Sequence, residues 1–420
     1  MYPDWPESEA DLVPLPQVDG PKLPPFNFQG PQDIKFIEHI GEGLHAHVFK
    51  VEISGQLYAL KLFRFPYDYD WEGPPAPATD DYDCDEYREL FSALYNYADP
   101  FTCECRAFGR LQESGHETVA LKCYGYVLLD EEHERTVMAQ FPKVASGADL
   151  DFTGSGDYPG LDELRSRFLG KSGRPPPIRG IVKELGVADE DNLRPAVARN
   201  VLRDIIRLQK LGIIGIDVRD VQIVSGKLCD FSTAVTTPHF LTTPEINPHL
   251  TADMVSLMEL ATFSIALQDY KSFDDMIREW NLFMGKARRI SITTFPGGRG
   301  SELPYNLRNK AAKGRIFTYV DPRSYDWRMR GANLETNGGD TIRRRRSERI
   351  SNVREREGVP RRGGFSRTRR PLTSTPSLWH FDCRFRPVIA AKLRAGNPPG
   401  VWLQWYLKDG FLFPYEVRDC

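Results

Sequence analysis

The chain has 420 residues, of which 40% are hydrophobic and 11% aromatic, enough for a buried core in one large or two smaller domains. No apolar run approaches the ~20 residues that cross a bilayer, so we expect no membrane association. The acidic, proline-rich start, MYPDWPESEADLVPLP, lacks the pattern of a signal or transit peptide, and we expect the protein in the nucleus or cytosol. The seven cysteines contain no CxxC pair and are expected to be free thiols.

The net charge of −3 conceals two blocks of opposite charge. Between residues 68 and 99, ten carboxylates accompany one arginine, whereas between Arg343 and Arg370 twelve arginines accompany three glutamates. Such an arginine run is typical of a disordered linker and often of a nuclear-localisation signal. Non-specific, salt-dependent DNA contact through Arg343–Arg370 is the alternative. Base stacking is not expected, because Phe365 is the single aromatic residue in the block.

Residues 1–31 contain eight prolines and predict a disordered arm. From Ile34 onward, alternating β-branched and aromatic residues, interrupted by glycines at 41, 43 and 55, predict three antiparallel strands. The acidic segment 66–98 has a WEGPPAPATDD core that is unsuited to regular structure, so we interpret the segment as an insertion.

A helix is predicted to begin at the Asp99–Pro100 pair and to end at Gly115. Two further strands, ETVALKCYGYVLL and RTVMAQF, are expected after it. Residues 32–142 are therefore expected to form a small lobe of five strands and one helix.

The second half predicts mainly helices. After the loop-like residues 151–177, an amphipathic helix is expected from Leu193 to Leu211, followed by short strands in IIGID and KLCDF. Further helical patterns cover Asp253–Asp269 and Asp274–Phe283. We divide the rest into a helical lobe at 143–290, a C-terminal extension at 291–335, an Arg-rich disordered linker at 336–375 and a tail at 376–420. For the tail, a docking segment and a gene-model artefact are both open.

Several residues are of types that carry chemistry. Gly41 and Gly43, followed by Val48, have the form of a loop whose backbone N–H groups cover phosphates; an ordinary hairpin turn is the alternative. Lys61 lies on an apolar strand and would need a carboxylate partner if buried, or would extend to water at the strand end. Glu104 on the following helix is the candidate partner, although a surface glutamate is the common case.

Two aspartates in the second half extend this pattern. Asp217 follows the long helix, and Asp230 follows a short predicted hairpin. Such a pair suits a base that orients a hydroxyl group and a ligand of Mg²⁺.

The order of these parts resembles the protein-kinase-like superfamily over residues 34–285. GEGLHAHVFKV is similar to its glycine loop, YALK to its strand lysine motif, Gly215-Ile216-Asp217 to HRD, Asp230-Phe231-Ser232 to DFG and Thr243-Pro244-Glu245 to APE. The resemblance implies an α+β fold of two lobes, a small five-stranded β lobe with one helix and a larger helical lobe, flanked by disordered arms. It also implies that ATP and Mg²⁺ bind in the cleft.

The resemblance implies a role for each site residue. Lys61, paired with Glu104, would contact ATP phosphates, and Asp217 would orient the acceptor. The remaining cofactor-binding positions would be Gly41, Gly43, Ala46 and Val48, and the metal ligands Asp230 and Gln222.

Departures from the superfamily pattern leave activity undecided. Ala46 replaces the third loop glycine, Gly215-Ile216 replaces the His-Arg pair, Gln222 replaces the second metal-binding asparagine, and Ser232 replaces the glycine of DFG. Two hypotheses remain: a pseudokinase-like subunit of a nuclear assembly, and an active ATP-dependent Ser/Thr phosphotransferase.

More narrowly, PFTCECRAFGRLQESG and DFSTAVTTPH resemble a fungal family named after the Fta-two subunit of the Sim-four kinetochore complex. This resemblance implies a nuclear, centromere-associated role with protein subunits as partners.

Overall fold

A computed structural model describes residues 5–6, 11–65, 85–144, 146–152, 165, 173–187, 193–285, 288–292, 294, 316–318, 320–328, 378–380 and 403–416. The chain divides into two compact units, one of residues 1–325 with 377–420 and one of residues 326–376. The predicted Arg-rich linker lies outside the described residues, and the elements and the site described below belong to the first unit. Among the described helices, none has the length and apolar composition needed to cross a membrane.

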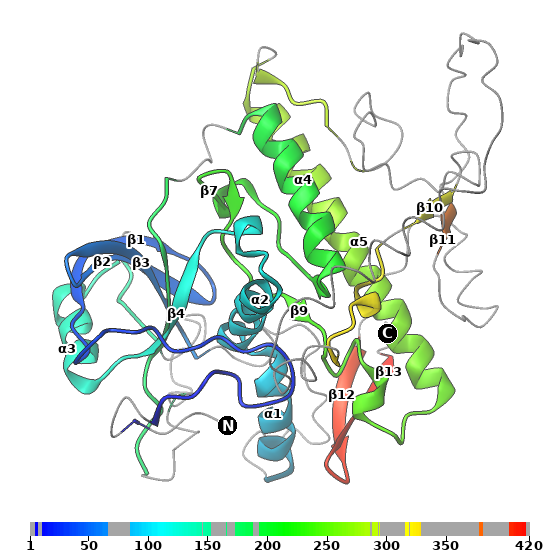
Figure 1. Ribbon diagram of the computed structural model, residues 1–420, viewed down its shortest axis with the longest axis horizontal. Coiled ribbons are helices and arrows are strands. Elements are labelled where there is room, and N and C mark those ends of the chain that lie inside the picture. The colour runs from blue at the N-terminus through cyan, green and yellow to red at the C-terminus, as the bar shows by residue number, and fades with distance from the viewer. Residues whose placement is uncertain are drawn as a thin grey trace, which may run out of the picture. The chain divides into compact units, whose positions relative to one another are not determined.

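The fold contains a five-stranded antiparallel sheet with strand order β1-β2-β3-β5-β4, whose first strands lie at the left in Figure 1. Its strands are β1 (Lys35–Glu42), β2 (Ala46–Ile53), β3 (Gln56–Phe63), β5 (Arg179–Glu184) and β4 (Cys123–Leu128). Ser54 and Gly55, both with positive φ, make the tight turn between β2 and β3 that suits a twisted hairpin. The three strands predicted after Ile34 are therefore confirmed.

The fifth strand was predicted in the wrong place. The segment RTVMAQF is helical and belongs to α3 (Glu131–Gln140), which the Asp130 side chain caps by accepting a hydrogen bond from the His133 amide. Acidic residues in the first turn favour this helix, an effect that outweighs the β-branched residues within it. The missing strand is β5, which lies beyond the predicted lobe boundary at residue 142.

Two helices precede β4 in the chain. The predicted helix is confirmed as α2 (Pro100–Ser114): Asp99 caps its first turn, and Gly115 ends it in the left-handed conformation. Part of the predicted insertion forms a helix, α1 (Asp85–Ala98), whereas its WEGPPAPATDD core lies outside the described residues. The apolar residues Leu90, Phe91 and Leu94 of α1 recur at helical spacing and are buried in the core.

Within the predicted disordered arm, the N-terminal segment of residues 11–31 packs onto the domain. Leu23 is fully buried, and the segment makes a β-bridge between Pro25 and Tyr126 of β4. Gly109 of α2 permits this approach, since a Cβ there would lie 2.6 Å from the Lys22 backbone. Proline-rich composition therefore reflects an extended chain that is held by side-chain burial.

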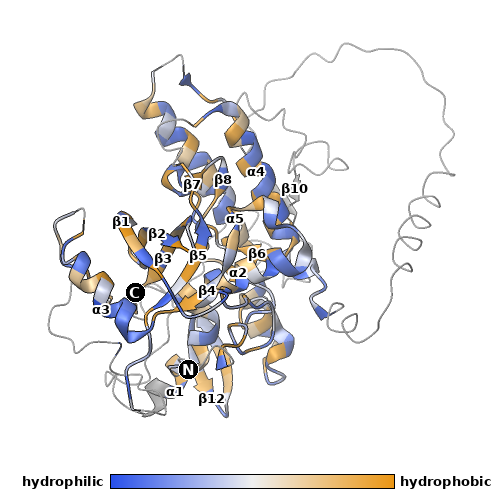
Figure 2. Cartoon of the chain, turned by 60° about the vertical axis from the view of Figure 1, so that its left-hand side comes forward, coloured by the Kyte–Doolittle hydropathy of each residue, from blue (hydrophilic) through white to orange (hydrophobic). Residues whose placement is uncertain are grey.

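The helix predicted from Leu193 to Leu211 is confirmed as α4 (Pro195–Lys210), which packs beside α5 (Ala252–Phe283) (Figure 1). Both helices mix hydrophilic and hydrophobic residues along their length (Figure 2). The two helical patterns predicted after residue 253 form one continuous helix, because Tyr270 and Phe273 continue its buried face without a break. Short pairs β6–β9 and β7–β8 lie in the connection between α4 and α5; they comprise β6 (Ile213–Ile214), β7 (Ile223–Val224), β8 (Lys227–Leu228) and β9 (Val235–Thr236).

The tail forms a hairpin of β12 (Leu403–Lys408) and β13 (Phe411–Glu416) that packs against the rest of its unit. Trp405 is 1% exposed, and its ring lies 4.5 Å from that of Phe240. Of the two alternatives for the tail, the docking segment agrees with this packing. Two shorter strands, β10 (Ile316–Thr318) and β11 (Leu378–His380), pair in parallel.

Candidate functional site

The candidate site is organised around Lys61 on β3. Lys61 lies opposite Val48 of β2 on one side and Ile181 of β5 on the other, so it occupies the centre of the sheet. Its side chain is 8% exposed and is directed at α2 rather than at water. Of the two alternatives for Lys61, burial with a carboxylate partner therefore describes its position.

Glu104 of α2 is that partner. Its fully buried carboxylate accepts a hydrogen bond from Lys61 Nζ at 2.8 Å. Asp99 and Pro100 start α2, and the apolar stripe of the helix packs on the core, so Glu104 points at the sheet. The alternative of a surface glutamate does not apply.

Asp230 completes the cluster from the second half of the chain. Its Oδ1 accepts a bond from Lys61 Nζ at 2.7 Å and another from the Ser232 amide at 2.9 Å. The next residue, Phe231, is buried and packs edge-on against Phe108 of α2, with ring centroids 5.2 Å apart. This packing directs the Asp230 side chain toward Lys61.

A second lysine in the cluster was not found by sequence reasoning. Lys183 of β5 pairs with the other carboxylate oxygen of Glu104 and donates a hydrogen bond to the Cys229 carbonyl at 2.8 Å. Lys183 lies in the strand RGIVKE, directly after the apolar residues Ile181 and Val182, a signal similar to the one that identified Lys61. It was missed because no strand was predicted there.

The four charges stabilise one another. Burial by itself would lower the pKa of Lys61, but the charges of Asp230 and Glu104 outweigh this effect and raise it above its usual value. Burial would raise the pKa of Asp230, yet Lys61 and Lys183 hold it well below its usual range. Lys61 and Asp230 are therefore ionised at neutral pH, and their side chains meet those of Glu104 and Lys183 in one buried cluster.

Asp217 and Gln222 lie together in the loop that precedes β7. The Gln222 amide group donates to Asp217 Oδ2 at 3.3 Å, and Arg219 forms an ion pair with the same oxygen at 2.7 Å. The Gln222 side-chain oxygen is buried and has no hydrogen-bond partner among the described residues. The Gln222 carbonyl accepts from the Cys229 amide, so Gln222 lies across a hairpin from the residue before Asp230.

The base of the Asp217 loop is held from α5, by a contact that the sequence did not suggest. Asp269 is 1% exposed, and its Oδ1 accepts the Ile216 amide at 2.7 Å. Thr233 in turn donates to the Gly215 carbonyl at 2.8 Å. The loops that carry Asp217 and Asp230 are therefore neighbours.

The predicted phosphate loop is the turn between β1 and β2. Ala46 is buried, whereas Gly43 has open space around it, since a Cβ there would meet nothing within 4 Å. Neither Gly41 nor Gly43 has positive φ, so the fold by itself does not require glycine at these positions. At the tip of the turn, His45 Nδ1 lies 3.2 Å from Ser232 Oγ, which joins the turn to the loop that carries Asp230.

Two buried arginines also hold α2. Arg110 donates to the Leu211 carbonyl at 2.9 Å and to the Thr237 carbonyl, and Arg106 donates to the Pro238 carbonyl. Their guanidinium groups satisfy backbone oxygens at the end of α4 and in the segment that follows Asp230. Glu104 therefore lies on a helix that is fastened at several points to the rest of the domain.

Comparison with known families gives one match. A family described as "Kinetochore Sim4 complex subunit FTA2" matches residues 12–235, more than half of the chain. The matched region begins in the N-terminal segment that packs on β4 and includes Lys61, Glu104, Lys183, Asp217 and Asp230. No curated protein matches the chain.

Proposed function

The chain belongs to the family of the kinetochore Sim4 complex subunit FTA2, and we propose that it acts in such a complex as a pseudokinase-like subunit that binds ATP and Mg²⁺. A subunit of a kinetochore complex works in the nucleus, at the centromere, with other protein subunits as partners. The observation that carries the nucleotide-binding proposal is the position of Lys61 between Glu104 and Asp230.

The arrangement of charges supports this proposal. A strand lysine held by a helix glutamate and a loop aspartate is the set of groups that protein kinases use to position ATP and its metal ion. Lys61 would contact the phosphates, and the open space at Gly43 would admit them. Asp230 and the unpartnered oxygen of Gln222 would bind Mg²⁺, which neutralises phosphate charge when bound.

Other contacts favour binding over phosphate transfer. Arg219 neutralises Asp217, the residue that would orient an acceptor hydroxyl. The β12–β13 hairpin packs on Asn247 and His249, where a peptide acceptor would approach. Asn247 donates a hydrogen bond to the Leu412 carbonyl, and the rings of His249 and Phe411 meet edge to face. These contacts oppose turnover rather than nucleotide binding.

An active Ser/Thr phosphotransferase is the second candidate. It is favoured by the retention of Asp217 and by the buried hydrogen bond from Ile216 to Asp269, which holds the Asp217 loop in place.

A thermal-shift titration with ATP and Mg²⁺ tests the binding proposal. We expect a rise in Tm with ligand concentration that is lost in Asp230→Asn and retained in Lys35→Met, which removes a 70%-exposed lysine of β1. The absence of a rise at saturating ATP and Mg²⁺ would refute the proposal. Labelled-ATP assays then separate the candidates: activity that Lys61→Met abolishes would establish the phosphotransferase.

We also propose non-specific DNA contact through Arg343–Arg370, which lie outside the described residues. The support is the excess of arginine in the sequence. Deletion of residues 343–370 should weaken binding to duplexes of unrelated sequence equally and flatten its salt dependence. Equal affinity of the deleted and full chains would contradict this proposal.

A further inference from the structure

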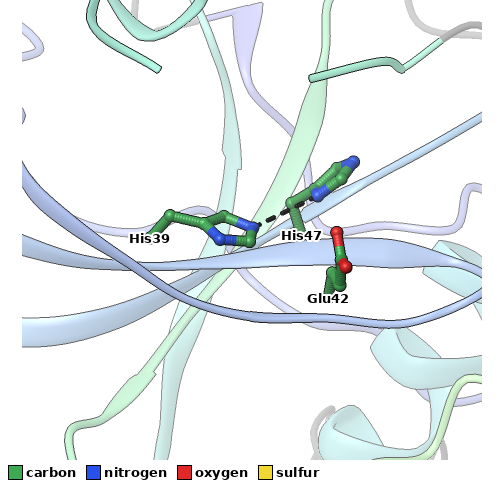
Figure 3. Close-up of side chains that lie close together, drawn as sticks. All are labelled: His39, Glu42 and His47. Carbon is green, nitrogen blue, oxygen red and sulfur yellow. Dashed lines mark hydrogen bonds between the residues drawn. The ribbon is translucent and has the colours of Figure 1, made fainter. Parts of the chain in front are cut away.

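A second group of ionisable side chains lies on the opposite face of the sheet from Lys61. In β2, Val48 is opposite Lys61 and His47 is opposite Leu62, so the alternation of side chains places His47 on the other face. His39 and Glu42, both from β1, lie beside it (Figure 3). One potential ligand atom from each residue lies within 4.8 Å of the others.

An irregularity in β1 brings these residues together. In an unbroken strand, residues 39 and 41 would share a face and residue 42 would point away. The register shifts between His39 and Gly41, so His39 is opposite Phe49 while Glu42 is opposite His47. The extra residue therefore turns the Glu42 carboxylate to the face of the two histidines, as β-bulges do when they redirect a side chain.

The distance between the histidines suits a shared metal ion. His39 Nε2 lies 3.3 Å from His47 Nδ1. Two nitrogens bound to one tetrahedral Zn²⁺ at about 2.0–2.1 Å are about 3.3–3.4 Å apart. A direct N–H···N hydrogen bond has a similar length, so this separation fits both the metal-free pair and a pair that binds one ion.

The surroundings of His47 prepare it for this role. Its Nε2 lies 3.1 Å from the Asp151 carbonyl oxygen, and an Nε2–H group that donates there leaves the lone pair on Nδ1, facing His39. A hydrogen bond to a backbone carbonyl is the usual support of a metal-bound histidine.

One nearby charge opposes a cation. Arg64 Nε lies 3.1 Å from His47 Nε2, and this nitrogen cannot both donate to Asp151 and accept from Arg64. The carboxylates of Glu42 and Asp151 interact electrostatically with Arg64. The formal charges of Arg64, Glu42 and Asp151 sum to −1, which still favours a bound cation beside them.

We propose that His39, Glu42 and His47 bind one Zn²⁺ ion, with the fourth coordination position left to water. Two imidazoles and one carboxylate form a ligand set that Zn²⁺ accepts, whereas Mg²⁺ and Ca²⁺ prefer oxygen alone. The ion links β1 to β2 beside Phe152, whose ring lies 5.3 Å from that of His47. It therefore stiffens the hairpin from the face opposite the Lys61 cluster, independently of nucleotide binding.

Zinc titration of the chelator-treated full chain, in competition with a chromogenic chelator, tests the proposal. We expect one equivalent of Zn²⁺ to bind, and Glu42→Gln and His39→Ala each to weaken binding by at least about 100-fold. His116→Ala, which removes an exposed histidine, is the matched control and should bind as the unmodified chain does. Co²⁺ should give the absorption spectrum of a tetrahedral site in the unmodified chain and in His116→Ala.

Two results would overturn the site. One is the absence of stoichiometric zinc binding in the unmodified chain, and the other is equal affinity in Glu42→Gln. Because Glu42 is exposed, its replacement should leave the fold intact, which far-UV circular dichroism checks. Failure of ATP binding would leave this test unaffected.

Discussion

Glu104→Gln removes a buried charge that two lysines share, and we expect it to destabilise the fold strongly. The Glu104 side chain is 0% exposed, and those of Lys61 and Lys183 are 8% and 6% exposed. Glutamine keeps the shape of the side chain but leaves two buried ammonium groups with one carboxylate, that of Asp230. Loss of one partner from a buried ion pair costs about 3–5 kcal/mol, so the free energy of unfolding should fall by this amount.

A charge-balanced double variant makes this prediction specific. Glu104→Gln combined with Lys183→Met restores equal numbers of positive and negative charges, so it should recover at least about 2 kcal/mol relative to Glu104→Gln alone. Urea unfolding followed by tryptophan fluorescence measures the single variants and the double variant. Lys35→Met, at an exposed surface pair, should change stability by no more than about 0.5 kcal/mol. Additive losses in the double variant would refute the shared-carboxylate reasoning.

Three further predictions follow from buried groups elsewhere. Leu23→Ala should lower the free energy of unfolding by about 2–5 kcal/mol, because Leu23 is fully buried; a loss below about 1 kcal/mol in urea unfolding would mean that the N-terminal segment is not part of the core. Trp405→Ala should cost about 3–5 kcal/mol and expose the β12–β13 hairpin to limited proteolysis, whereas unchanged cleavage would contradict its packing on Phe240. Burial and, to a lesser extent, Arg106 lower the pKa of His239, so the unfolded chain binds a proton that the folded chain does not. The contribution of His239 to the free energy of unfolding should therefore be fully present above about pH 6.5 and should decrease as the pH falls below that value. Urea unfolding at several pH values measures this dependence, and His239→Asn should remove the part that His239 causes.

Short-range features of the fold were predictable because neighbouring residues cause them. Asp99 and Pro100 start α2 whatever packs on it, and Gly115 ends it through its own left-handed conformation. The charge of Lys61 on an apolar strand indicated a buried partner for the same local reason. The failed prediction of a disordered N-terminal arm depended on distant contacts, because β4 and α2 cover the segment that holds Leu23.

The sequence by itself determined the ends of α2, the first three strands, and which lysine, glutamate and aspartate were candidates for one cluster. Only the tertiary structure decided that β5 comes from residues 179–184 and that Lys183 pairs with Glu104 alongside Lys61. It also decided that His39, Glu42 and His47 meet on the face of the sheet opposite Lys61. Helix caps and turns are set by interactions over a few residues. Strand order, burial and the meeting of charges depend on chain segments far apart in sequence, whose proximity no local pattern encodes.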